Sequence, residues 1–78
     1  MPHVTVRYFA MLREQRGCSE EQLSIAEETV GQLYDRLFPP GPQGQLTVAF
    51  AVNQAYVGRE QPLVDGDEVA FIPPVGGG

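Results

Sequence analysis

The sequence contains no lysine, no tryptophan and a single cysteine, Cys18. With one cysteine the chain cannot form an internal disulfide or a thiolate cage for zinc or an iron–sulfur cluster. Arg16 would favour a reactive thiolate at Cys18, but Glu20 and Glu21 oppose it, so we expect an inert thiol. The absence of lysine excludes polymers of this chain linked through side-chain amines.

Positive charge is also scarce. Five arginines stand against ten acidic residues, and the formal net charge is −5 at pH 7. No basic patch is visible, so we expect no nucleic-acid partner. The longest apolar run, residues 48–52, is too short to span a bilayer, and no signal-peptide pattern is present. These features predict a cytoplasmic protein with no membrane partner.

Side chains suited to catalysis or metal binding are few. His3 is the only histidine, and we expect it on the surface at the start of a strand. Asp65, Asp67 and Glu68 surround a turn, where clustered carboxylates are usually solvated, so we predict no metal site. No Gly-x-x-x-x-Gly-Lys phosphate loop occurs. The chain therefore carries no catalytic constellation of its own.

Alternating apolar residues predict a set of strands, because every second side chain of a strand faces the core. The expected strands are residues 3–9, 22–25, 46–53, 55–58 and 68–72. The residues expected on the buried face of the first and last strands are Val4, Val6, Tyr8, Val69 and Phe71.

Two helices are expected between these strands. The first covers residues 10–16 and ends at Gly17, which suits a left-handed backbone. The second begins at Thr29, because Thr29 and Gln32 have the spacing of a capping box. It then shows an apolar stripe that comprises Val30, Leu33, Tyr34, Leu37 and Phe38. One long helix across one face of a mixed sheet of four to five strands predicts an α+β grasp fold, with the last strand beside the first. If these two strands are parallel neighbours, Phe9 and Ile72 lie close together.

The end of the chain is unusual. The last six residues are Pro73, Pro74, Val75, Gly76, Gly77 and Gly78. The two prolines cannot donate to a sheet ladder, so they end the last strand. Six extended residues reach about 20 Å, and glycine can thread a channel too narrow for other residues. We therefore predict one domain, residues 1–75, and a flexible glycine tail, residues 76–78.

The carboxylate of Gly78 cannot react unaided. A terminal carboxyl has a pKa of about 3.5, so it is ionised at neutral pH and is a poor electrophile. To accept sulfur or form an amide it must become a mixed anhydride, most simply an acyl-adenylate made from ATP. Because the chain lacks a phosphate loop, that step is expected to belong to a partner enzyme.

A partner-binding surface is expected beside the tail. Strand alternation turns Phe9, Ala70 and Ile72 away from the helix, and Tyr56 can join them from a neighbouring strand. An apolar patch on an open sheet face is a place where a partner would bury area. The residues predicted to bind a partner are Phe9, Tyr56, Ile72, Pro73, Pro74 and Val75.

The chain resembles the small, sulfur-carrying subunits of molybdopterin synthase, which are ubiquitin-like β-grasp proteins. The stretches that carry the resemblance are residues 9–10, 13–14, 17, 51–54, 62–63, 65–71, 73–75 and 77–78. A Gly-Gly end alone is not specific, since ubiquitin and the thiamine sulfur carrier share it. Gly76 stands where the family tolerates various residues.

The resemblance implies a mechanism. An E1-like activating enzyme would adenylate Gly78 with ATP and magnesium, and a sulfur donor protein would convert the adenylate to a thiocarboxylate. The chain would then dock on the large subunit of molybdopterin synthase and pass its sulfur to a cyclic pyranopterin precursor. It would be the non-catalytic, sulfur-donating subunit of a heteromeric sulfurtransferase, with no permanently bound cofactor.

Three other functions remain open. A sulfur carrier for thiamine, tRNA or cysteine synthesis would use the same tail chemistry with another recipient. A ubiquitin-like modifier would form amides with lysines of target proteins. An interaction module would have an inert tail.

Overall fold

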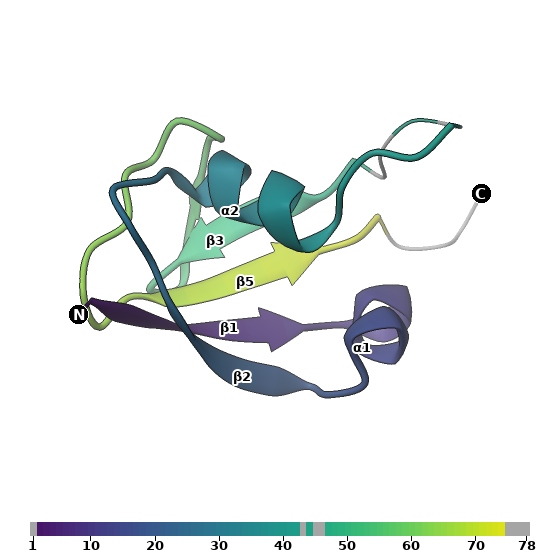
Figure 1. Cartoon of the computed structure of the whole chain (residues 1–78), viewed down its shortest axis with the longest axis horizontal. Helices are drawn as coiled ribbons and strands as arrows, with labels where there is room; N and C mark the ends of the chain where they lie inside the picture. The colour runs from purple at the N-terminus through teal and green to yellow at the C-terminus, as the bar shows by residue number, and fades with distance from the viewer. Residues whose placement is uncertain (1, 43, 45–46, 75–78) are drawn as a thin grey trace.

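The computed structural model describes residues 2–42, 44 and 47–74 (Figure 1). Within this part of the chain the elements are β1 (His3–Tyr8), α1 (Ala10–Arg16), β2 (Glu20–Ser24), α2 (Val30–Leu37), β3 (Ala49–Val52), β4 (Ala55–Val57) and β5 (Glu68–Ile72). No helix among the described residues is long and apolar enough to cross a membrane.

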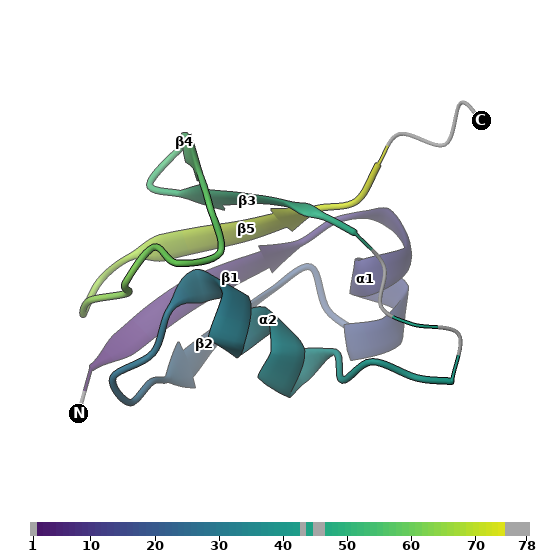
Figure 2. The same ribbon diagram turned by 90° about the horizontal axis from the view of Figure 1, so that it is seen from above.

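The described strands form one mixed sheet in the order β2-β1-β5-β3-β4. The first and last strands, β1 and β5, are parallel neighbours in a register that runs from Thr5 beside Glu68 to Tyr8 beside Phe71. All other pairs are antiparallel. The second helix, α2, crosses one face of the sheet (Figures 1 and 2). The predicted ubiquitin-like β-grasp fold, of class α+β, is confirmed.

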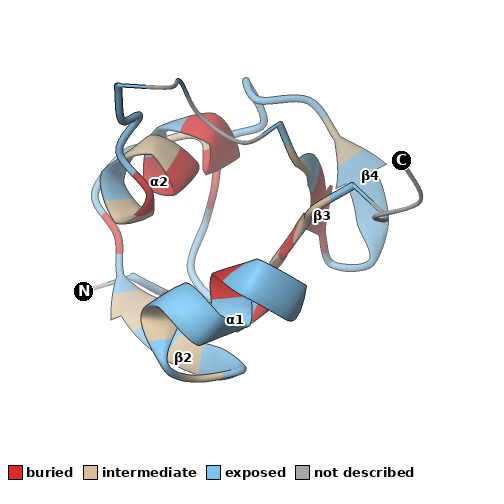
Figure 3. Ribbon diagram, turned by 90° about the vertical axis from the view of Figure 1, so that its right-hand side faces the viewer, coloured by how far each residue is buried: buried red, intermediate tan, exposed pale blue. Residues whose placement is uncertain are grey.

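The core lies between α2 and the sheet. Val6, Val69 and Phe71 have no exposed surface, as the alternation of apolar residues predicts. Phe71 contacts the aromatic rings around it, with ring centroids 5.0 Å from Tyr34 and 5.8 Å from Phe50. In Figure 3 buried residues mark α2 and β3, whereas most of α1 is exposed. Leu12 is the buried residue of α1.

Several predicted strand boundaries are wrong. β2 begins at Glu20 and ends before Ile25, because its ladder with β1 pairs residues 3–7 with residues 24–20. β3 covers only residues 49–52, since Thr47 and Val48 lie outside the ladder. The first strand ends at Tyr8, because Phe9 is already the N-cap residue of α1.

Both predicted helix ends are confirmed. The Thr29 hydroxyl accepts a hydrogen bond from the backbone N–H of Gln32 at 3.2 Å. The side-chain oxygen of Gln32 accepts one from the backbone N–H of Thr29 at 2.9 Å. This reciprocal capping box satisfies two donors at the start of α2. Gly17 ends α1 with φ 76°, a left-handed conformation that glycine adopts without steric penalty.

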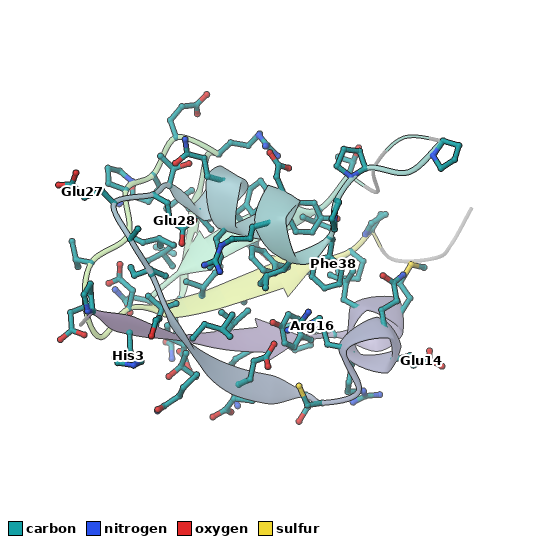
Figure 4. All side chains as sticks on the ribbon, in the orientation of Figure 1. His3, Glu14, Arg16, Glu27, Glu28 and Phe38 are labelled. Atoms are coloured by element: carbon teal, nitrogen blue, oxygen red, sulfur yellow. The ribbon has the colours of Figure 1, made fainter. Side chains whose placement is uncertain are left out.

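A charged hydrogen-bond network ties α1 to the hairpin of β1 and β2. One carboxylate oxygen of Glu21, Oε1, accepts from the Tyr8 hydroxyl at 2.6 Å and from Arg16 Nη2 at 2.7 Å. The Arg16 guanidinium also lies 5.8 Å from the Tyr8 ring centroid (Arg16 in Figure 4). Burial raises the pKa of Tyr8. The hydrogen bond from Tyr8, followed by that from Arg16, lowers the pKa of Glu21.

This network predicts a dependence of stability on pH. Because the folded-state pKa of Glu21 is lowered, its contribution is present above the ordinary glutamate pKa of about 4.3 and is lost as pH falls through the folded value. Glu21→Gln should reduce the free energy of unfolding by about 1 kcal/mol at pH 7. The difference from wild type should shrink below about pH 4.

Urea unfolding followed by circular dichroism between pH 2.5 and pH 7 measures this difference. Glu14→Gln is the control, because Glu14 is an exposed carboxylate on α1, the helix that carries Arg16. It should change stability by less than about 0.5 kcal/mol. A Glu21→Gln deficit that stays constant at all pH values would contradict the role of the ionised carboxylate.

Candidate functional site

The root of the C-terminal segment lies at the end of the sheet that also holds α1. β1 and β5 are parallel, so β5 ends beside the start of α1 (Figures 1 and 2). Pro73 is half-buried and Pro74, the last described residue, is exposed. The other predicted tail residues, Val75, Gly76, Gly77 and Gly78, lie outside the described residues. The structure therefore places the root of the predicted tail and not its tip.

The face of the sheet opposite α2 carries a shallow groove of about 250 Å³. Three residues predicted to bind a partner, Phe9, Tyr56 and Ile72, line it together. Phe9 is 45% exposed and Tyr56 is 77% exposed, which is unusual for large apolar side chains. The sequence thus predicted that these three residues would lie together. Their role in binding stays a prediction.

Strand register explains why these residues meet. Arg7 is in register with Ala70, Ala70 with Ala51, and Ala51 with Tyr56. Residues in register on neighbouring strands point to the same face, so this row crosses the centre of the groove. Arg7 and Ala51 were not among the predicted site residues. The signal that locates them is alternation, since Tyr8 and Phe50 beside them point into the core.

Charged residues lie at one end of the groove. Arg7 lies 3.4 Å from the Glu68 carboxylate and 3.6 Å from the Glu20 carboxylate. About half of the Arg7 side chain is exposed, and exposed ion pairs contribute at most about 1 kcal/mol. These contacts can therefore rearrange at little cost when a partner binds.

The backbone next to Phe9 has an unusual conformation. Phe9 is the N-cap residue of α1, in an extended conformation, and the next residue, Ala10, has φ 50°. A left-handed conformation costs an alanine about 1–2 kcal/mol. The chain passes from β1 into α1 without a loop, and no sequence pattern predicts this backbone strain. Such strained residues are often found at functional sites.

The predicted solvated turn of Asp65, Asp67 and Glu68 is wrong for Asp67, which is only 7% exposed. Its carboxylate accepts from Asn53 Nδ2 at 2.9 Å and from the Val64 amide at 2.9 Å. Asn53 in turn accepts from the Glu68 amide at 3.0 Å. Asp67 therefore joins the turn between β3 and β4 to the turn before β5.

The remaining candidate residues lie away from the groove. Cys18 is partly buried against the core. His3 is exposed, as predicted, at the opposite end of the sheet from α1 (Figure 4). Residues 2–42, 44 and 47–74 contain no group of three or more His, Cys, Asp or Glu side chains that could hold a metal ion.

The position of Asp67 leads to a stability prediction. Asp67→Ala should destabilise the domain by about 2 kcal/mol or more, because it leaves the Asn53 amide and the Val64 N–H without their acceptor. Asp65→Ala removes the same charge from an exposed carboxylate that accepts one bond from the His3 amide. That control should cost less than about 1 kcal/mol. Equal losses in urea unfolding would show that Asp67 is not the connecting residue.

In a comparison with protein families, the model of the ThiS family matches residues 6–78. Two similar curated proteins are both molybdopterin synthase sulfur carrier subunits. The one from Mycobacterium tuberculosis is 41% identical over 85 residues, covering 100% of this chain and 100% of the relative. The one from Escherichia coli is 36% identical over 80 residues, covering 96% of this chain and 99% of the relative.

A solved structure with the same fold is small archaeal modifier protein 1 of Haloferax volcanii. It superposes with a TM-score of 0.81 at 25% sequence identity, covering 96% of this chain and 100% of that chain. Similarity in sequence and similarity in fold therefore both extend over nearly the whole domain.

Proposed function

The chain belongs to the ThiS family, and from this we propose that it is the sulfur carrier subunit of a molybdopterin synthase. The observation that carries the proposal is the near-complete coverage of curated carrier subunits. The position of the tail root supports it, because β5 runs directly into Pro73 and Pro74 at an exposed end of the molecule. The residue with a chemical role in this proposal is Gly78.

The chemistry at Gly78 follows from the inertness of a carboxylate. The carboxylate oxygen attacks the α-phosphorus of ATP on an activating enzyme, which releases pyrophosphate and leaves an acyl-adenylate. A persulfide on a donor protein then attacks the acyl carbon and displaces AMP, which leaves an acyl disulfide. A thiol cleaves its S–S bond by forming a disulfide with the donor cysteine, and the thiocarboxylate is released. The thiocarboxylate gives its sulfur to a cyclic pyranopterin precursor, and water restores the carboxylate. ATP and magnesium serve the activating enzyme and are not resident cofactors of this chain.

The groove on the open sheet face is the proposed docking surface for the large subunit. Phe9, Tyr56 and Ile72 supply its apolar area, and aromatic residues are enriched in the centres of interfaces. The groove is next to Pro73, because Ile72 both lines it and ends β5. A large subunit bound at this groove would therefore hold the root of the tail as well.

A second candidate function is protein modification, favoured by the fold shared with a small archaeal modifier protein. In that case the activated Gly78 would form an amide with a lysine of a target protein. Because this chain contains no lysine, side-chain conjugation could attach single copies but not chains of it. Conjugates of higher mass that resist reducing agents would identify this function.

The proposed chemistry predicts a mass change. Incubation with the cognate activating enzyme, ATP and a sulfur donor should add the mass of one oxygen-to-sulfur exchange, located at Gly78 by fragmentation. Deletion of Gly78 should abolish the exchange and leave the melting temperature unchanged, since chain ends contribute little to stability. Sulfur found on Cys18, or sulfur gained without ATP, would show that the mechanism is wrong.

The proposed docking surface predicts the effect of added charge. Phe9→Glu, Tyr56→Glu and Ile72→Glu should each weaken the complex with the large subunit by at least about 2 kcal/mol, or roughly 30-fold in Kd. Val64→Glu is the matched control, since Val64 is 62% exposed and does not line the groove. Isothermal titration calorimetry measures the affinities, and circular dichroism checks each fold. Wild-type affinity in all three groove variants would place the partner elsewhere.

A further inference from the structure

We propose that the centre of the groove is a socket for one protruding apolar side chain of the large subunit, and that the small size of Ala51 and Ala70 determines which partner fits. The inference rests on the proposed function and adds the chemistry of the contact. It makes two alanines, which contribute little surface of their own, the residues that control specificity.

The register row across the groove shows the socket. From one side to the other it reads Arg7, Ala70, Ala51 and Tyr56 on four neighbouring strands. Two methyl groups thus lie in the middle, with a long side chain at each end. Ala51 is only 8% exposed although α2 packs on the opposite face. A short side chain on an open face becomes this inaccessible because taller neighbours rise around it.

The size and the walls of the groove indicate its occupant. Its volume of about 250 Å³ lies below the roughly 300–1,000 Å³ of small-molecule sites. It is closer to the size of one or two side chains. Phe9, Ile72 and Tyr56 surround the alanines with mainly apolar surface. Interface hot spots are found where a large side chain fills such a desolvated pocket near the centre of an interface.

The charges of the groove favour an apolar side chain over a charged one. Arg7 and Glu68 pair with each other at one edge. The floor at Ala51 and Ala70 offers only methyl side chains. A charged group on this floor would lose its water, and its partner would have to come from the rim, from Arg7 or Glu68 after their ion pair breaks or from Gln54. An apolar side chain loses nothing by the same desolvation.

A size series at residue 70 tests the socket. The variants are Ala70→Gly, Ala70→Val and Ala70→Leu. Together with the wild-type alanine they form a series in which the apolar side chain at this partly exposed position grows from glycine to leucine. If the centre is a socket, affinity for the large subunit should fall as the side chain grows, with a loss of at least ten-fold for Ala70→Leu. If the groove is only an apolar surface that binds without shape specificity, the affinity for the large subunit should rise along the series, because each larger side chain adds apolar area. The sign of the trend therefore decides between the two.

Ala55→Leu is the matched control. Ala55 is an exposed alanine of β4 in register with the core residue Val52, so it lies on the face opposite Tyr56, and it does not line the groove. It should change the affinity by less than two-fold. Urea unfolding verifies each fold, and Ala70→Val supplies the test if the leucine variant is unfolded, because β-branched residues suit strands.

The outcomes separate the inference from the function on which it rests. A wild-type chain that shows no binding to its large subunit would overturn the proposed function and the socket together. Wild-type binding with an affinity that is constant or rises from glycine to leucine would overturn the socket alone.

Discussion

The parallel pairing of β1 with β5 determines the two faces of the molecule. Because side chains alternate along a strand, the register that sets Tyr8 beside Phe71 sends both into the core. The same register sends Arg7 and Ala70 to the open face. A slip of one residue would exchange the faces, exposing the core residues of one strand and burying its groove residues. The core and the groove are therefore specified by one set of backbone hydrogen bonds.

Hydrogen bonds at both ends of the sheet connect its strands to the adjoining turns and to α1. At one end, Asp67 and Asn53 connect the turn before β5 to the turn after β3, while the Thr5 amide donates to the Asp67 carbonyl at 3.0 Å. At the other end, Glu21 connects Tyr8 of β1 to Arg16 of α1. Tyr8 and Glu21 are 13 residues apart, and Asn53 and Asp67 are 14 residues apart, so both connections depend on the tertiary fold.

Much of this architecture follows from local sequence patterns. The alternation at Val4, Val6 and Tyr8 and the capping box at Thr29 each reflect the conformation of a few neighbouring residues, so sequence alone predicted them. The buried Asp67 and the strained Ala10 depend on partners or constraints brought by tertiary structure. The same holds for the bounds of β2, which are determined by its ladder with β1. The prediction that Phe9, Tyr56 and Ile72 lie together used strand alternation and the condition that the first and last strands are parallel neighbours, which the structure meets. The hollow above the two alanines depends on the sizes of the side chains around them.

The arrangement separates recognition from chemistry. In the proposed function the described residues bind, and the reaction takes place beyond them at Gly78. Gly78 lies four residues after Pro74, and even a fully extended chain between them spans at most about 14 Å. A partner that holds the groove thus confines the carboxyl group to a small volume beside its own active site. Tethering of this kind replaces a second binding event by an intramolecular one, with effective concentrations in the millimolar range for short linkers. The precision of sulfur delivery then depends on how firmly the groove is held, because a movement of the body moves the root of the tail with it.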